Sequence, residues 1–82
     1  MNREELREKL KSIIASQLSI KPEEIADGIT FDELGADSLD RVEVVMKIEE
    51  AFDIELNDDE MEKITTFGAL VEYVDKVLQA QA

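Results

Sequence analysis

Apolar residues recur at helical spacing over most of the chain. Near the N-terminus, one face of a helix would collect five of them: Leu6, Leu10, Ile13, Ile14 and Leu18. Asn2 and Glu5 form a capping pair ahead of that face. These features predict a first helix over residues 3–17.

The stretch SIKPEEIADGITFDELGAD, residues 19–37, breaks this periodicity. Pro22, Gly28 and Gly35 interrupt it and predict a long connection, with one helical turn at PEEI because proline suits a first helical position. Structureless loops of this length are unusual in compact domains. We expect the connection to be held against the core by apolar residues that return every few positions: Ile20, Ile25, Ile29, Phe31 and Leu34.

A second helix is predicted over residues 39–52, and its apolar face is wider than a surface helix needs. The apolar residues cover well over half of the circumference: Leu39, Val42, Val44, Val45, Met46, Ile48, Ala51 and Phe52. Two interpretations are open. Either the helix is central and packs on three neighbours, or some groups, Leu39 and Met46 foremost, reach solvent or a partner.

Two further helices complete the pattern. Asn57 and Glu60 form a capping pair before a short helix of about two turns. Thr65 or Thr66 caps a final helix with one clear apolar side: Phe67, Leu70, Val71, Val74, Val77 and Leu78. Residues 54–56 resemble a strand but are too few to begin a sheet. The fold class is therefore all-α, a four-helix bundle of three longer helices and one short helix, with a long loop between helices one and two.

Composition limits the chemistry of this chain. With 82 residues, we expect one domain over residues 1–82. There is no cysteine and no histidine, so disulfides, thiolate chemistry and the usual neutral-pH base are excluded. No apolar run of about 18 residues and no signal-peptide core is present, and we therefore expect a soluble, cytoplasmic protein.

Acidic residues are concentrated in the middle of the chain. The formal net charge is −12, and residues 32–62 hold thirteen acidic residues against Arg41 and Lys47, a net −11. This field repels nucleic acid and anionic lipid and attracts basic partners. Solubility would be a simpler reason for acidity, but the concentration in one stretch favours a partner surface.

Independent catalysis is not expected. Without histidine or cysteine, carboxylates would have to act, and pairs such as Glu49–Glu50 are sequence neighbours that do not face each other on a helix. The stretch DIELNDDEMEKI, residues 53–64, alternates acids as a calcium loop does. It has Asp58 where that loop needs glycine and Ile64 where it needs glutamate, so no metal site is predicted.

Ser38, in LGADSLD, is the candidate for chemistry. A serine before an apolar helix is commonly its cap. Asp37 can take that role instead, because Asp40 stands three residues later, and Ser38 would then be the first helical residue with its hydroxyl pointing outward. A phosphate ester there would lie near the positive end of the helix dipole, opposed by the two nearby aspartates. A plain phosphoserine would satisfy the same argument.

The segments LGADSLD, IEEAFDIEL, NDDEMEKI and TTFGALVEYV together resemble the acyl carrier protein of bacterial type II fatty acid synthesis. The resemblance covers nearly the whole chain and is tightest over residues 34–66. It implies a non-catalytic carrier in which Ser38 bears 4′-phosphopantetheine, added from coenzyme A by a phosphopantetheinyl transferase. Growing fatty acyl chains would be carried as thioesters, and the cofactor would supply the thiol that the chain lacks.

The resemblance also implies two surfaces. Basic patches of the transferase and of fatty acid synthesis enzymes would dock, fast and reversibly, on eight residues: Asp37, Leu39, Asp40, Val42, Glu43, Met46, Glu49 and Glu50. The acyl chain would lie between the helices in a cavity lined by Val44, Ile48, Leu56, Ile64 and Leu70. Ordinary core packing would explain these five residues equally well. We expect a monomer without nucleic-acid partners or stable membrane insertion.

Arg41 departs from the family pattern, which usually has a small or neutral residue there, and it interrupts the acidic surface. Two alternatives to the fatty acid carrier stay open. A carrier for another pathway, polyketide or D-alanyl transfer, would share fold and cofactor. An acidic helical adaptor without a prosthetic group would use Ser38 as a cap or a phosphorylation site.

Overall fold

The computed structural model describes residues 2–81, so the two ends of the expected domain, residues 1 and 82, lie outside the described residues. The elements are α1 (Arg3–Leu18), the 3₁₀ turn η1 (Pro22–Glu24), α2 (Ser38–Phe52), α3 (Asp58–Lys63) and α4 (Phe67–Gln81). Three longer helices and one short helix confirm the all-α prediction. Backbone pairing outside helices and turns is limited, within residues 2–81, to an isolated bridge between Thr30 and Thr66.

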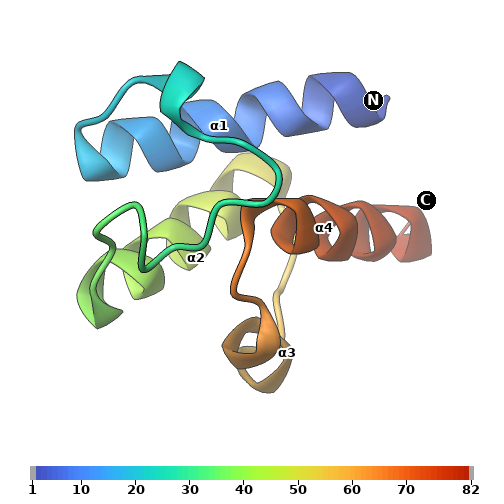
Figure 1. Cartoon of the computed structure of the whole chain (residues 1–82). Coiled ribbons are helices and arrows are strands. Elements are labelled where there is room, and N and C mark those ends of the chain that lie inside the picture. The colour runs from blue at the N-terminus through green and yellow to red at the C-terminus, as the bar shows by residue number, and fades with distance from the viewer. Residues whose placement is uncertain (1, 82) are drawn as a thin grey trace.

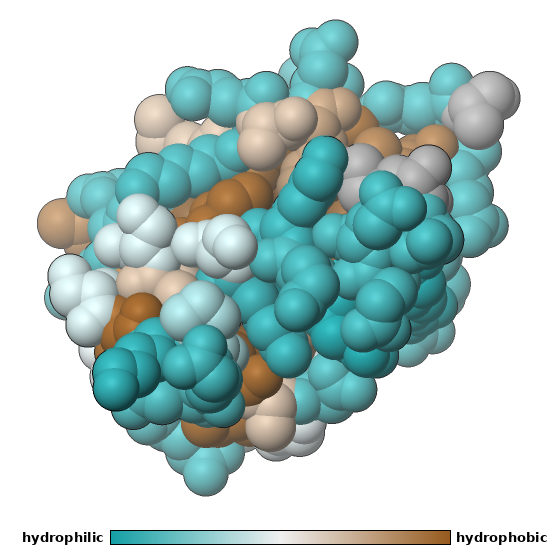
Figure 2. Space-filling view, turned by 90° about the horizontal axis from the view of Figure 1, so that it is seen from above, coloured by the Kyte–Doolittle hydropathy of each residue, from teal (hydrophilic) through white to brown (hydrophobic). Residues whose placement is uncertain are grey.

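Helix α1 lies across one side of the molecule and packs on both α2 and α4 (Figure 1). The short α3 lies on the opposite side, below α2 and α4 in that view. Most of the α1 side is hydrophilic, with hydrophobic patches showing between polar side chains (Figure 2). No helix within residues 2–81 is long and apolar enough to cross a membrane.

The core lies between the three longer helices. Its fully buried side chains are Leu6, Leu10, Ile14, Ile25, Ile48, Phe67, Leu70, Val71 and Val74. Helix α4 contributes four of these side chains, which is the consequence of the clear apolar side that the sequence shows. The apolar side that the pattern predicts for α4 is therefore the side that is buried.

Three of the helices begin at residues whose side chains satisfy a free backbone N–H. The Asn2 side chain accepts a hydrogen bond from the Glu5 N–H at 2.8 Å, and the Asn57 side chain accepts from the Glu60 N–H at 3.0 Å. At α4, Thr66 Oγ1 accepts from the Ala69 N–H at 3.2 Å. These caps confirm the predicted starts and select Thr66 over Thr65.

The long connection between α1 and α2 is held against the core, as its apolar spacing predicts. Ile25 and Phe31 are buried, and Ile20, Ile29 and Leu34 pack partly buried beside them. The PEEI turn forms as η1.

The connection also completes the start of α4. Its carbonyls at Ile29 and Asp27 accept hydrogen bonds from the Phe67 and Gly68 N–H groups at 3.0 and 2.7 Å. Those N–H groups have no partner inside their own helix. A Cβ on Gly68 would meet the Asp27 carbonyl oxygen at 2.9 Å, so this approach requires glycine.

Candidate functional site

Asp37 caps α2 and leaves Ser38 as the first helical residue. The Asp37 carboxylate accepts a hydrogen bond from the Asp40 N–H at 2.8 Å, and the Asp40 carboxylate accepts one from the Asp37 N–H at 3.3 Å. This reciprocal arrangement occupies the capping role that Ser38 could otherwise have taken. Ser38 is exposed, and none of the described residues forms a hydrogen bond with its hydroxyl.

The segment before Ser38 is an ordered helical turn. The Glu33 carboxylate accepts from the Thr30 N–H and hydroxyl, each at 3.0 Å, and Thr30 Oγ1 accepts from the Glu33 N–H at 3.1 Å. The turn ends at Gly35, whose φ of 82° is left-handed, and the Ala36 N–H donates to the Phe31 carbonyl at 3.0 Å. The route into α2 is therefore fixed by local hydrogen bonds.

The sequence analysis missed this turn, although its signals are present. Thr30 and Glu33 have capping-box spacing, and Gly35 suits a left-handed helix end. The hydrogen bonds from the Thr30 backbone and side chain hold the pKa of the Glu33 carboxyl below its ordinary value. The negative charge on Glu33 therefore stabilises the turn.

A cleft of about 580 Å³ opens beside Ser38. Its volume falls within the roughly 300–1,000 Å³ typical of ligand pockets. Its walls come from α1, the turn before α2, α2, α3 and α4: Ile14, Leu18, Phe31, Ala36, Ser38, Arg41, Val42, Val44, Val45, Met46, Glu49, Asp58, Met61, Glu62 and Leu70. Because Ser38 is exposed and also lines the cleft, it lies where the cleft meets solvent.

Two of the five residues expected in an acyl cavity, Val44 and Leu70, line this cleft. The other three, Ile48, Leu56 and Ile64, are buried in the core and are not among the lining residues. The lining includes apolar residues that the sequence analysis did not assign to a cavity: Ile14, Leu18, Phe31, Val45 and Met61. Their contribution depends on how α1 and α3 close around α2, which periodicity along one helix does not reveal.

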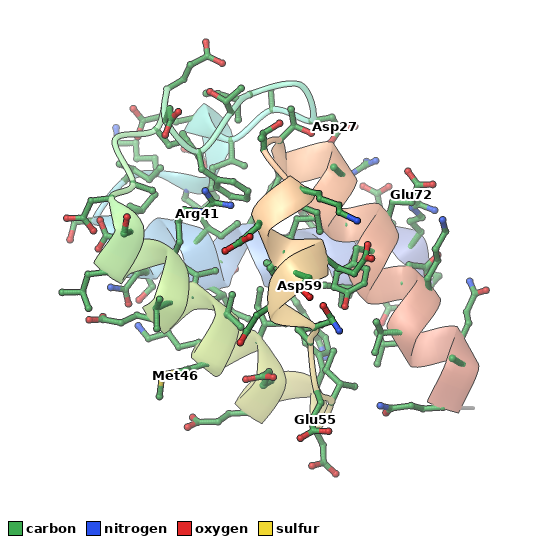
Figure 3. All side chains as sticks on the ribbon, turned by 90° about the horizontal axis from the view of Figure 1, so that it is seen from below. Asp27, Arg41, Met46, Glu55, Asp59 and Glu72 are labelled. Atoms are coloured by element: carbon green, nitrogen blue, oxygen red, sulfur yellow. The ribbon has the colours of Figure 1, made fainter. Side chains whose placement is uncertain are left out.

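The apolar residues of the expected partner surface are exposed on α2. Leu39, Val42 and Met46 are 64%, 56% and 54% exposed, and Met46 points away from the bundle in Figure 3. Their spacing of three and four residues places them on one face. Of the two interpretations of the wide apolar face, the structure therefore supports the one in which some groups reach solvent.

The acidic residues of the same surface differ in how freely they are presented. Asp37 and Glu50 are exposed, whereas Asp40, Glu43 and Glu49 are half-buried. Gln17 Nε2 of α1 donates to the Glu43 carboxylate at 2.6 Å and to Asp40 at 3.5 Å. The Glu49 carboxylate accepts from the Leu56 N–H at 2.9 Å. These three carboxylates also hold the fold together.

Arg41 turns inward and does not merely interrupt the acidic surface. Its Nη2 donates to the carbonyl oxygens of Met61 and Ile64 at 3.2 and 3.0 Å. Its guanidinium carbon lies 5.7 Å from the centre of the Phe31 ring, within cation–π distance. Figure 3 shows the side chain reaching from α2 toward α3. These partners cannot be inferred from the sequence, because they are backbone carbonyls twenty or more residues away.

The residues around Ser38 fit a phosphate-linked arm. The hydroxyl is exposed at the N-terminal turn of α2, where helix N–H groups and the dipole favour an attached anion. An apolar cleft begins at the same residue. Among residues 2–81, no three acidic side chains come together in a way that could hold a metal ion.

Comparisons with known proteins agree with this geometry. The family model of the phosphopantetheine attachment site matches residues 8–74. The acyl carrier protein of Thermotoga maritima is 32% identical, with a TM-score of 0.86 over 100% of this chain and 96% of that one. The HMG-ACPI domain from the CurA module of Lyngbya majuscula is 29% identical, with a TM-score of 0.84 over 98% of this chain and 81% of that one. The chain therefore belongs to the phosphopantetheine attachment site family, with the fold of an acyl carrier protein, and is a non-catalytic carrier whose prosthetic group is 4′-phosphopantetheine.

Proposed function

We propose that Ser38 is the residue that carries 4′-phosphopantetheine. The observation that carries this assignment is the free, exposed Ser38 hydroxyl on the first turn of α2, with the cap supplied by Asp37. Because Asp37 satisfies the helix end, an ester on Ser38 removes no hydrogen bond that the fold needs. When bound, the arm supplies the thiol that holds acyl groups as thioesters.

The loading step requires an accessible serine hydroxyl from this chain. The Ser38 oxygen forms a bond to phosphorus while the pyrophosphate bond of coenzyme A breaks. The adenosine bisphosphate leaves with the electron pair, and a base on the transferase takes the hydroxyl proton. The carrier must therefore present its hydroxyl without obstruction, which the ordered turn ending at Gly35 and Ala36 achieves.

The cleft beside Ser38 is the proposed shelter for the acyl cargo. Apolar side chains from four helices surround it, and chain burial there removes apolar surface from water. Val44 and Leu70 contact that space directly, while Ile48, Leu56 and Ile64 form the core behind it. An apolar acyl chain is the cargo class that this lining favours.

We further propose that the carrier serves fatty acid synthesis as a cytoplasmic monomer. Exposed Leu39, Val42 and Met46 beside Asp37 and Glu50 offer apolar contact flanked by negative charge. Such a surface suits brief docking on basic patches of the transferase and of synthesis enzymes, because charge raises the association rate without requiring high affinity. The same net charge disfavours nucleic acid.

The attachment assignment is tested by intact mass. The apo-protein is incubated with coenzyme A and a broad-specificity phosphopantetheinyl transferase, and the expected gain equals one phosphopantetheinyl group. Ser38→Ala should abolish the gain, whereas Ser12→Ala, on the exposed side of α1, should not affect it. A gain that persists in Ser38→Ala would contradict the assignment. No gain in either protein would instead favour an adaptor without a prosthetic group.

The pathway is tested separately with the loaded carrier. Purified fatty acid synthesis enzymes should elongate an acyl group on it, with chain growth read by mass after release. If loading succeeds and elongation fails, a carrier of polyketide or D-alanyl transfer becomes the better assignment. Absence of elongation would therefore contradict the fatty acid pathway without contradicting the assignment of Ser38.

A further inference from the structure

Helix α3 has few means of holding its own position. It contains six residues, none of them buried, and within residues 2–81 it has no extensive backbone contact with another helix. Helices shorter than about 12 residues are marginal in water without tertiary support. The position of α3 therefore depends on Met61, which packs partly buried against the core, and on contacts near the two ends of the helix.

The start of α3 is held from both α4 and α2, where the Glu49 carboxylate accepts from the Leu56 N–H, and its end is held from α2. Before α3, the Asn57 N–H donates to the Tyr73 hydroxyl of α4 at 2.9 Å. After α3, Arg41 of α2 donates to the Met61 and Ile64 carbonyls at 3.2 and 3.0 Å. The Met61 carbonyl also accepts from the Ile64 N–H at 3.1 Å, so Arg41 adds a second donor there, and a cation at the end of a helix interacts favourably with the negative end of its dipole. Arg41 therefore supplies both hydrogen bonds and charge at the end of α3.

Arg41 also belongs to the wall of the cleft. Asp58, Met61 and Glu62 of α3 line it together with residues of α2, Arg41 among them. Figure 3 shows α3 lying between α2 and α4, with the Arg41 side chain reaching toward its end. The guanidinium also lies over the Phe31 ring, which further restrains it. Arg41 therefore links α2 to the end of α3 at the wall of the cleft.

We propose that Arg41 is a positioning residue that fixes α3 as a wall of the cleft and so determines how well the cleft shelters its cargo. The part of this proposal that concerns cargo rests on the proposed function. The part that concerns α3 does not, because the contacts exist without a prosthetic group. Lysine reproduces them less well, because both bonds come from Nη2 of a planar guanidinium that also lies over the Phe31 ring, whereas an ammonium is a compact charge that does not stack in this way.

The first experiment measures amide hydrogen exchange in the apo-protein. Arg41→Met keeps an apolar stem and removes the hydrogen bonds. Lys47→Met is the matched control, because Lys47 is exposed on the same helix and its loss changes the charge of the acidic stretch equally. Loss of hydrogen bonds from a charged donor should accelerate exchange over residues 58–64 by roughly ten- to hundredfold in Arg41→Met. Arg41→Lys should fall between Arg41→Met and wild type.

Amides of α1 in the same samples distinguish local from global opening. Exchange in α1 should stay at the wild-type rate in every variant, and Lys47→Met should match wild type in α3 as well. The proposal is overturned if Arg41→Met exchanges like Lys47→Met, or if α1 and α3 accelerate equally. Should Arg41→Met unfold, Arg41→Lys is read by the same two criteria.

The second experiment uses the protein loaded with a long saturated acyl group. Hydroxylamine attacks the thioester carbonyl, forming the acyl hydroxamate and releasing the thiol, so its rate reports exposure of the bond. We expect wild type and Lys47→Met to react several-fold more slowly than the acyl-coenzyme A, and Arg41→Met to lose that protection. Equal protection in Arg41→Met would overturn the sheltering role. A third outcome separates the two parts of the proposal. If the wild-type thioester is not protected but α3 exchanges faster in Arg41→Met, the cleft is refuted as the cargo site and the positioning of α3 by Arg41 is retained.

Discussion

Helices α2 and α4 have the same length of 15 residues but use their apolar side chains differently. Helix α4 buries Phe67, Leu70, Val71 and Val74, all on one side. Helix α2 buries only Val44 and Ile48 and exposes three large apolar side chains to solvent: Leu39, Val42 and Met46. Burial of all of them would stabilise the fold further. Helix α4 thus builds the core, and the apolar side chains that α2 leaves exposed are those that its proposed docking role requires.

The largest expected effect comes from replacing one leucine by alanine on each of the two helices. Leu70 is fully buried and Leu39 is 64% exposed. Leu70→Ala should lower the free energy of unfolding by about 2–5 kcal/mol, because it leaves a cavity. Leu39→Ala should change it by less than about 0.5 kcal/mol. Urea denaturation followed by circular dichroism measures both.

The same pair also tests the binding role of α2. Leu39→Ala should reduce the transferase kcat/KM by roughly fivefold or more, as truncation of a central interface contact does. Equal stability losses in the two variants would remove the contrast between the helices. An unchanged kcat/KM in Leu39→Ala would remove Leu39 from the docking surface.

The next effect concerns how each helix begins. The start of α4 needs Gly68 because the Asp27 carbonyl lies where a Cβ would stand. Gly68→Ala should destabilise the protein by about 1–3 kcal/mol, as other overpacked sites do. Gly28→Ala is the matched control, since a Cβ there meets nothing within 4 Å. Thermal unfolding that is equally affected by both substitutions would show that the contact with Asp27 is not the cause.

The start of α2 is held by the capping pair Asp37 and Asp40 without a close backbone approach of this kind, so the loss should be smaller. Asp37→Ala should cost about 0.5–2 kcal/mol of unfolding free energy. Asp37→Ser restores a capping oxygen without the charge and should recover most of that loss. If the serine variant is as unstable as the alanine variant, the charge of Asp37 matters more than its hydrogen bond. Transferase kinetics on Asp37→Ser then report the docking charge by itself.

What the sequence could predict follows from the range of the interactions. The starts of α1, α2 and α3 and the apolar side of α4 depend on residues within one turn of each other, and they were predicted. The Arg41 contacts with Met61 and Ile64, and the fit of Gly68 against Asp27, join residues far apart in the chain. The cleft has the same origin, since its lining comes from four helices. Periodicity places a residue on a face but does not say which backbone group that face meets.

The smallest expected effect concerns the turn that leads into α2, which depends on a titratable carboxylate. The start of α4, in contrast, depends on fixed backbone contacts. Hydrogen bonds from Thr30 lower the pKa of Glu33 below its ordinary value of 4.5. A lowered folded-state pKa means that the ionised form stabilises the fold above the ordinary pKa, and that this contribution is lost as the pH falls through the folded value. Wild type should therefore exceed Glu33→Ala in stability near neutral pH, with the difference shrinking in acid.

Glu33→Gln provides the control for that measurement. Its amide oxygen can still accept from Thr30, but the side chain does not titrate. The difference between Glu33→Gln and Glu33→Ala should therefore stay constant with pH, while the difference between wild type and Glu33→Ala should not. Other acids titrate in the same range, but they contribute equally to all three proteins and cancel in the comparison. The contrary outcome is a difference in unfolding free energy between wild type and Glu33→Ala that does not change with pH. It would mean that backbone contacts hold the turn before Ser38, as they hold the start of α4, and that the charge of Glu33 does not distinguish the two regions.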